Sequence, residues 1–319
     1  EENDPLIPEI DPSGELQAGS RVAVVSKSTS GEFWGLVKKG MEQAIADVNE
    51  AYGFKKEDQV TMTFEGASDE KDVESQVNTI DAVIAENPDV LCVSASDMDS
   101  LQAQLEAAKE NGIPVVAFDS GVTDSKMVRA FRGTDNTRVG EIAAYRLATA
   151  IGKMGKVAVF SAQEKTQSIQ ERVSGFTNYI TNYPDIEVVE IVYQDQVDDM
   201  TAAMQEVLDK YPQLDGVFCN NADIADLYLD MKKDETKDSI VMVGVDATAK
   251  QQEAIRNSKE VGVVSQQPYA MGYQTIWTAL LTTAPKKSVE IKRNVRIDPA
   301  WIDSSNIDDP TYSSYLYAN

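Results

Sequence analysis

The sequence contains no histidine among its 319 residues. Ser-His-Asp and Cys-His nucleophile systems, an imidazole base and His-ligated zinc are therefore excluded. Basic residues are also few, since 29 Lys and Arg stand against 53 Asp and Glu, a formal net charge of −24. Such a chain repels phosphate backbones and anionic lipid headgroups, so the sequence predicts no nucleic-acid partner.

Cysteine and long apolar runs are scarce as well. Cys92 and Cys219 lie in short apolar runs typical of buried strands, and we expect core thiols rather than a disulfide. No run of 18 or more apolar residues is present, so no transmembrane helix is predicted. Residues 1–19 are rich in proline and acidic residues, as in a linker. We expect a processed N-terminus, from which a signal peptide or a lipid-anchored cysteine has been removed.

Short runs of β-branched residues alternate with longer amphipathic stretches from residue 21 onward. This pattern predicts parallel strands covered by helices. Apolar residues between the strands fall on one helix face, as at Val37, Met41 and Val48. The predicted strands are residues 21–26, 60–65, 90–95, 114–119, 156–161, 186–193, 215–220, 240–246 and 261–266.

The two halves of the chain resemble each other. The run Arg21–Val24 resembles the run Lys156–Val159. Gly40 and Gly175 follow the first residues of these runs at the same interval of 19 positions. At this length a single hydrophobic core usually divides into two. We therefore predict an α/β protein of two lobes, each a doubly wound, Rossmann-like unit with a parallel sheet.

Two predicted strands end in aspartate at matching places in the two halves, Asp119 and Asp246. In an open parallel sheet, ligands bind beyond the carboxyl ends of the strands, near the point where strand order reverses. The two aspartates are therefore candidates for contact with one shared ligand. The alternative is that each aspartate caps the helix that follows it.

Residues 24–34 join a strand end to a polar and aromatic loop. Ser26 ends the strand, and Phe33 and Trp34 begin the next predicted helix. Such rings can pack on an apolar face of a ligand, although an aromatic pair at a helix start also suits the core.

Planar polar groups recur at strand and helix ends in the second half, at Arg172, Asn221 and Gln266. Together with the two aspartates, these groups suit a polar ligand whose groups both donate and accept hydrogen bonds. Taken alone, Arg172 is typical of a surface salt bridge and Asn221 of a helix cap.

In this order the motifs resemble the sugar-binding proteins of bacterial ABC importers that are similar to ribose-binding protein, over about residues 20–297. The resemblance implies the type I periplasmic binding protein fold, which is LacI-like. One match in the first loop falls on either Ser30 or Gly31. The ligand-binding residues that the resemblance implies are Ser26, Ser30, Phe33, Trp34, Asp119, Ser120, Arg172, Asn221, Asp246 and Gln266.

Two positions depart from the family pattern. Ser120 stands where ribose binders carry an arginine, and Val197 lies where another aromatic residue is expected. The sequence therefore predicts a monosaccharide, pentose or hexose, without favouring ribose. The acidic pair Asp198 and Asp199 lacks the glycine and glutamate of a calcium loop, so no metal and no cofactor are expected.

The resemblance also implies a three-strand hinge, with crossings between the lobes near Thr134, Gln266 and Asn294. Sugar bound in the cleft between the lobes would favour a closed form that an ABC importer's membrane permease recognises. We expect a monomeric, extracytoplasmic protein, in the periplasm or anchored by lipid at the cell surface. The predicted divisions are a linker at 1–19, an N-terminal lobe at 20–133 plus 267–294, and a C-terminal lobe at 134–266 plus 295–319.

Three other functions occur to us for this architecture, of which the first two are disfavoured. An enzyme is disfavoured because residues 26–31 match neither a dinucleotide-binding nor a P-loop glycine spacing. A sugar-responsive repressor would need a basic helix-turn-helix, which the acidic N-terminal segment does not supply. A sensor that presents a sugar-like ligand, such as a furanose autoinducer, to a membrane receptor remains open as the alternative.

Overall fold

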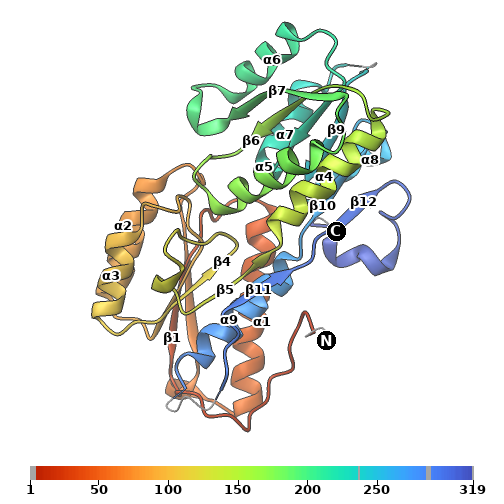
Figure 1. The fold of residues 1–319 in the computed structure, drawn as a ribbon. Coiled ribbons are helices and arrows are strands. Elements are labelled where there is room, and N and C mark those ends of the chain that lie inside the picture. Colours follow the sequence, from red (N-terminus) through yellow and green to blue (C-terminus); the bar gives the residue numbers. More distant parts are fainter. Residues whose placement is uncertain (1–4, 236–237, 285–288, 318–319) are drawn as a thin grey trace. The chain divides into compact units, whose positions relative to one another are not determined.

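The computed structural model describes residues 5–235, 238–284 and 289–317 (Figure 1). The chain is an α/β protein that divides into two compact units, each built on a six-stranded sheet. The predicted linker and lobes include residues 1–4, 236–237, 285–288 and 318–319, which lie outside the described residues. Unit 1 comprises Glu1–Thr134, Lys165–Gln167 and Gln267–Ile297, and unit 2 comprises Asp135–Glu164, Ser168–Gln266 and Asp298–Asn319.

The sheet of unit 1 is parallel throughout, in the order β11-β5-β4-β3-β1-β2. Chain order reverses between β1 and β3, which is the switch point of a doubly wound sheet. The strands are β1 (Arg21–Val25), β2 (Thr61–Glu65), β3 (Val90–Val93), β4 (Val115–Phe118), β5 (Ala130–Thr134) and β11 (Asn294–Ile297).

Helices cover both faces of this sheet (Figure 1). Ala23 and Val25 belong to the core under α2 and α3, whereas the alternate residues Val22 and Val24 are buried on the opposite face. The helical elements of unit 1 are α1 (Glu32–Tyr52), η1 (Lys56–Asp58), α2 (Val73–Ala85), α3 (Gln102–Glu110), η2 (Ser125–Met127) and α9 (Pro268–Leu281).

Unit 2 repeats this order as β12-β10-β9-β8-β6-β7, again with a reversal after its first strand, β6. Its edge strand β12 pairs antiparallel with β10, so the sheet is mixed at one edge rather than fully parallel as predicted. The strands are β6 (Gly155–Ser161), β7 (Ile186–Tyr193), β8 (Gly216–Cys219), β9 (Val241–Val245), β10 (Gly262–Ser265) and β12 (Ala300–Asp303).

Strand β6 shows the two-sided core of unit 2. Val157 and Val159 pack in the cluster under α4 and α5, while Ala158 and Phe160 pack under α6 and α7. The helical elements of unit 2 are α4 (Asn136–Ala150), α5 (Gln167–Ile180), η3 (Gln194–Gln196), α6 (Met200–Lys210), α7 (Ala222–Met231), α8 (Ala249–Arg256) and η4 (Pro310–Tyr315).

The repeated glycines mark the same close helix contact in both units. A Cβ atom on Gly40 in α1 would lie 2.0 Å from the carbonyl oxygen of Tyr269 at the start of α9. A Cβ atom on Gly175 in α5 would lie 2.2 Å from the carbonyl oxygen of Thr137 in α4. Only glycine allows these helix backbones to approach so closely, which explains the interval found in the sequence.

The nine predicted strands all occur, within a few residues of their predicted ends. Cys92 and Cys219 are free and fully buried, which confirms two core thiols. Strand β5 was not predicted because Arg132 and Gly133 interrupt its apolar run. The described part of the predicted linker has no regular secondary structure but lies against α1, where Tyr52 Oη donates to the carbonyl oxygen of Asp11 over 3.1 Å.

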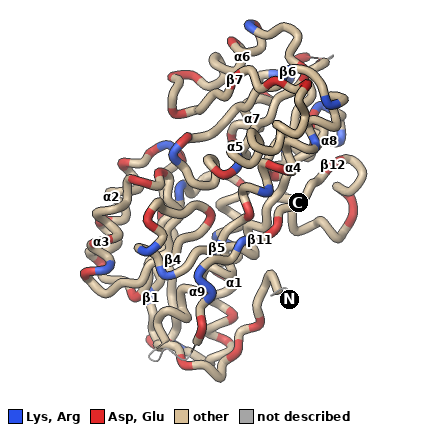
Figure 2. Tube along the Cα trace, viewed as in Figure 1, with Lys and Arg blue, Asp and Glu red and all other residues tan. Residues whose placement is uncertain are grey.

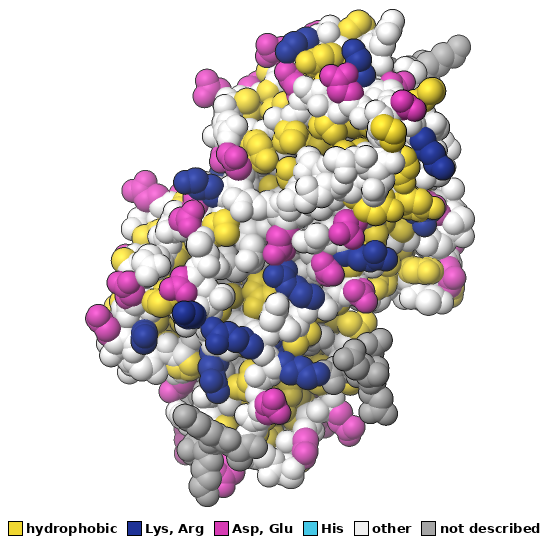
Figure 3. Space-filling view, viewed as in Figure 1, with side chains coloured by type: hydrophobic (Ala, Val, Ile, Leu, Met, Phe, Trp, Pro, Cys, Tyr) yellow, Lys and Arg dark blue, Asp and Glu magenta, His cyan; other side chains and the backbone are white. Residues whose placement is uncertain are grey.

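Acidic residues are spread over both units (Figure 2). Lys and Arg side chains gather on the visible face of unit 1 (Figure 3). Lys109, Lys126, Arg129 and Arg293 line a groove of about 540 Å³ in this unit. This groove opens near the amino ends of β4, β5 and β11, at the opposite end of the sheet from the predicted ligand residues. Among the described residues, no helix has both the length and the apolar character needed to cross a membrane.

Candidate ligand-binding site

Asp119 follows β4 at the carboxyl end of the unit 1 sheet, one strand away from the switch point between β1 and β3. Its backbone has φ 62° and its N–H donates to the carbonyl oxygen of Arg132 over 2.9 Å. A non-glycine residue in this left-handed region is uncommon and often belongs to a functional site. The side chain is 4% exposed, and its Oδ2 accepts a hydrogen bond from Ser94 Oγ over 2.8 Å. Asp119 does not cap the next helical element, η2, because Asp124 does so.

Lys27 is a buried cation beside Asp119, and the sequence analysis did not single it out. Its Nζ lies 2.7 Å from Asp119 Oδ2, and both side chains are buried. Burial of an isolated charge is very unfavourable, so each of these groups depends on the other. Ser120, the position of the family arginine, is fully buried, and its N–H donates to the carbonyl oxygen of Phe118. The cation beside Asp119 is therefore supplied by the loop after β1.

Buried polar contacts fix the loops that follow β1 and β3. Ser26 Oγ donates to the carbonyl oxygen of Ser28 over 2.6 Å, so this predicted site residue uses its hydroxyl within the loop. Gln76 in α2 donates to the carbonyl oxygens of Ser26 and Ser94 and accepts from the N–H of Ser96. Gln76 thereby holds together the two strand ends that carry Lys27 and Ser94.

The predicted aromatic pair lies at the start of α1. Phe33 and Trp34 pack edge to face, with ring centroids 4.9 Å apart, and both are buried. Trp34 also contacts Phe118, the residue before Asp119, and its indole N–H donates to Glu70 Oε1 over 2.8 Å. Trp34 thus has the contacts of a core residue. Ser30 is exposed in the loop before the helix.

Arg172 lies over the carboxyl end of the unit 2 sheet. Its Nε donates to Asn136 Oδ1 and its Nη1 to the carbonyl oxygen of Asn220, each over 2.9 Å. Asn220 is fixed in turn, because its Nδ2 donates to Ser161 Oγ over 2.7 Å. A guanidinium carries five N–H donors, so these contacts orient Arg172 and leave the Nη2 edge with no protein partner among the described residues.

Asp246 follows β9 with φ 71° and is 4% exposed, like Asp119 in unit 1. Its N–H donates to the carbonyl oxygen of Val264, and its Oδ2 accepts from the N–H of Ala222 over 3.1 Å. Thr248, not Asp246, caps the following helix α8. The capping alternative is therefore wrong for both aspartates.

Asn221 does cap a helix, because its Oδ1 accepts from the N–H of Ile224 at the start of α7. Its amide Nδ2 has no partner among the described residues, so capping and ligand contact are compatible at this position.

Gln266 and Tyr317 complete the surroundings of Asp246. Gln266 Nε2 donates to Asp246 Oδ1 over 2.7 Å, and Tyr317 Oη donates to the same oxygen over 2.6 Å. Burial, followed by the charge of Asp246, raises the pKa of Tyr317 well above its usual value, so the phenol stays neutral. The sequence analysis did not predict the contact between Tyr317 and Asp246.

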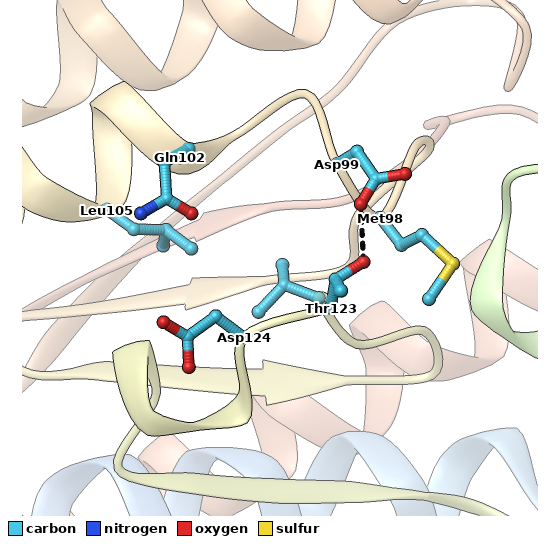
Figure 4. A pocket seen from close by; sticks show the side chains of 7 residues that line it. Met98, Asp99, Gln102, Leu105, Thr123 and Asp124 are labelled. Atoms are coloured by element: carbon cyan, nitrogen blue, oxygen red, sulfur yellow. Dashed lines mark hydrogen bonds between the residues drawn. The ribbon is translucent and has the colours of Figure 1, made fainter.

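A separate cavity of about 120 Å³ lies in unit 1 between α3 and the loop after β4 (Figure 4). Asp99 and Asp124 contribute carboxylates to it, and Thr123 Oγ1 donates to Asp99. None of the predicted ligand-binding residues lines this cavity. Nowhere in the described residues do three potential metal ligands of the His, Cys, Asp and Glu types come together.

Known proteins with similar sequences are named as sugar-binding proteins. The ribose import binding protein RbsB of Bacillus subtilis is 27% identical over 64% of this chain and 66% of its own length. RbsB of Escherichia coli is 24% identical over 60% of this chain and 64% of its own length. These matches therefore span just under two thirds of the relatives.

Solved structures match over almost the whole chain. An ABC transporter solute-binding protein from Agrobacterium vitis with bound D-fucose has a TM-score of 0.85 and 28% identity, covering 93% of this chain and all of that one. A carbohydrate transporter solute-binding protein from Agrobacterium radiobacter with D-arabinose has a TM-score of 0.83 and 28% identity, covering 94% and 99%.

The family model described as the periplasmic binding protein domain matches residues 22–284, which include both strand-end aspartates and most of both sheets. The similar structures confirm the two doubly wound units predicted from the internal repeat. They also confirm the type I periplasmic binding protein fold that the resemblance implied. On this match, the chain belongs to the periplasmic binding protein domain family.

Proposed function

We propose that this protein binds one monosaccharide between its two units and delivers it to an ABC importer. The observation that carries the proposal is the pair of buried strand-end aspartates, Asp119 and Asp246, each held in the left-handed backbone region with an acceptor position left over. Two oriented carboxylates facing one ligand suit a molecule that presents hydroxyl donors on two sides.

Donors beside each carboxylate complete the match to a sugar. Lys27 adjoins Asp119, while Arg172 and Asn221 offer N–H groups beyond the unit 2 sheet. A sugar hydroxyl both donates and accepts, so neighbouring acceptors and charged donors can engage one hydroxyl pair. We infer that an arginine at position 120 is not needed, because Lys27 supplies the cation beside Asp119 in unit 1.

Relatives and similar structures support a pentose or hexose. Three similar solute-binding proteins carry D-fucose, D-arabinose or α-D-tagatopyranose in their solved structures, and the two RbsB relatives are named for ribose import. These sugars differ in carbon number and hydroxyl configuration. We therefore propose the class, a single monosaccharide, rather than one member of it.

We infer from the family description that the protein acts outside the cytoplasm. We further propose that it is a monomer and that a lipid anchor in the full-length protein would hold it at the cell surface. A permease would recognise the form in which both units contact the sugar. We infer that binding involves no turnover, since the named relatives are binding proteins and the chain has no histidine.

A thermal-shift screen of the purified protein tests this function. We expect a rise in Tm with at least one of D-ribose, D-arabinose, D-fucose, D-tagatose and D-allose, because ligand at 100 times Kd adds roughly 2.7 kcal/mol of stability. The matched control is the double variant Asp119→Asn/Asp246→Asn, which should show no rise. A protein that responds to none of these sugars, or a double variant that responds as well as the wild type, would contradict the proposal.

A further inference from the structure

The segment after β12, residues 304–317, lies across the carboxyl ends of β9 and β10. Tyr317 N–H donates to the carbonyl oxygen of Ala247 over 3.1 Å, and Ser265 Oγ donates to the carbonyl oxygen of Tyr315 over 2.6 Å. Ile307 is buried in a small core with residues of α8, β10 and β12. Backbone contacts and apolar packing therefore both fix this segment on unit 2.

Tyr317 brings a buried hydroxyl to the predicted site. Its ring is 6% exposed, and its Oη accepts from the backbone N–H of Gln266 while donating to Asp246 Oδ1. Because the N–H of Gln266 occupies a lone pair of Oη, the phenol proton is directed toward the carboxylate. The hydroxyl is thus a fixed donor to Asp246.

The acceptor positions of Asp246 can be counted. A carboxylate oxygen accepts about two hydrogen bonds. Oδ1 accepts from Tyr317 Oη and Gln266 Nε2, so it is saturated, and Oδ2 accepts from the N–H of Ala222. One acceptor position therefore remains, on Oδ2. Its direction depends on the plane of the carboxylate, which the contacts to Oδ1 set.

We propose that Tyr317 is a positioning residue of the monosaccharide site, which holds the plane of Asp246 so that the last acceptor position of Oδ2 faces one sugar hydroxyl. This inference rests on the proposed function and deepens it. It assigns a role in ligand recognition to the segment after β12. No contact of Tyr317 with the sugar itself is required.

Calorimetric titration of Tyr317→Phe with the tightest-binding monosaccharide tests the inference. We expect affinity to fall about tenfold, because the phenyl ring keeps the packing but removes the hydrogen bond. Tyr315→Phe is the matched control from the same segment, since no hydrogen bond from its hydroxyl occurs among the described residues, and its affinity should stay within twofold.

Adding Tyr317→Phe to two other variants distinguishes the positioning of Asp246 from a general loosening of the site. In Asp246→Asn, adding Tyr317→Phe should change affinity by less than twofold, because the group being positioned is already altered. In Asp119→Asn, adding Tyr317→Phe should still reduce the affinity for the sugar about tenfold. An affinity of Tyr317→Phe within twofold of wild type, or an equal tenfold loss in both backgrounds, would overturn the positioning role. A wild-type protein that binds no monosaccharide would instead overturn the proposed function, and this inference with it.

Discussion

Asp119 in unit 1 and Asp246 in unit 2 have the same backbone but different surroundings. Both follow the fourth strand of their unit, both have φ between 62° and 71°, and both donate an N–H to the neighbouring strand. Asp119 is stabilised by the cation of Lys27, whereas the donors to Asp246 are the neutral groups of Gln266, Tyr317 and Ala222.

This difference separates what the duplicated fold fixes from what each unit adds. The repeated strand end sets the position and backbone angles of the aspartate. The groups that stabilise its charge come from a different segment in each unit. In unit 1 the loop after β1 supplies Lys27, and in unit 2 the segment after β12 supplies Tyr317. The stability of the two units should therefore respond differently when the groups that contact Asp119 or Asp246 are removed.

The largest expected effect is that of Lys27→Met, which leaves Asp119 buried without its cation. Removal of one partner of a buried ion pair destabilises by about 3–5 kcal/mol, and urea unfolding of the ligand-free protein measures this loss. Lys27→Met/Asp119→Leu should recover much of the stability. If Lys27→Met cost less than Tyr317→Phe, the proposed contrast between the two units would be wrong.

The helix contact that both units share should respond equally in the two. Gly40→Ala and Gly175→Ala each place a Cβ about 2 Å from a backbone carbonyl oxygen, and we expect each to destabilise by about 3 kcal/mol. Gly35→Ala, where no atom lies within 4 Å of the new Cβ, is the control. Tolerance of the change in only one unit would mean that the two packings are not equivalent.

Glu260 gives unit 2 a pH dependence. Burial raises its pKa well above 4.5, with a further contribution from Asp226, and neither carboxylate oxygen has a hydrogen-bond partner in the described part of the chain. The folded state therefore keeps the proton above pH 4.5 while the unfolded state releases it, so stability falls as pH rises toward the folded-state pKa.

Glu260→Gln should remove this fall and gain on the order of 2 kcal/mol at pH 8, but little at pH 4. Urea unfolding at both pH values checks the prediction, with the exposed Glu253→Gln as control. An equal gain at pH 4 and pH 8 would contradict a titrating Glu260.

The smallest effect concerns helix capping next to Asp246. Thr248→Ala removes the cap of α8 and should cost about 1 kcal/mol without changing the affinity for sugar. Thr248→Ser is the conservative control. A tenfold loss of sugar affinity in Thr248→Ala would show that the cap and the Asp246 site are not separate.

Much of the fold could be predicted from the sequence, because β-branched runs and the repeated glycine interval report directly on strands and close helix contacts. Strand β5 could not, since Arg132 and Gly133 hide its apolar pattern. The two strand-end aspartates were also found from the repeat.

Their compensating groups were harder to find. A lysine is rarely buried, so its place after a predicted strand did not single out Lys27 as a site residue. Tyr317 lies 71 residues from Asp246, and no local pattern connects residues so far apart. Predicting such contacts requires knowing where the chain passes after β12.

The most direct test of the account is calorimetry of one monosaccharide with the wild type, Asp119→Asn and Asp246→Asn. If one sugar contacts both aspartates, the wild type binds with 1:1 stoichiometry and each variant loses roughly 30- to 150-fold in affinity, or about 2–3 kcal/mol. Circular dichroism should show that both variants are folded. Unchanged affinity in either folded variant would contradict a site shared by the two units.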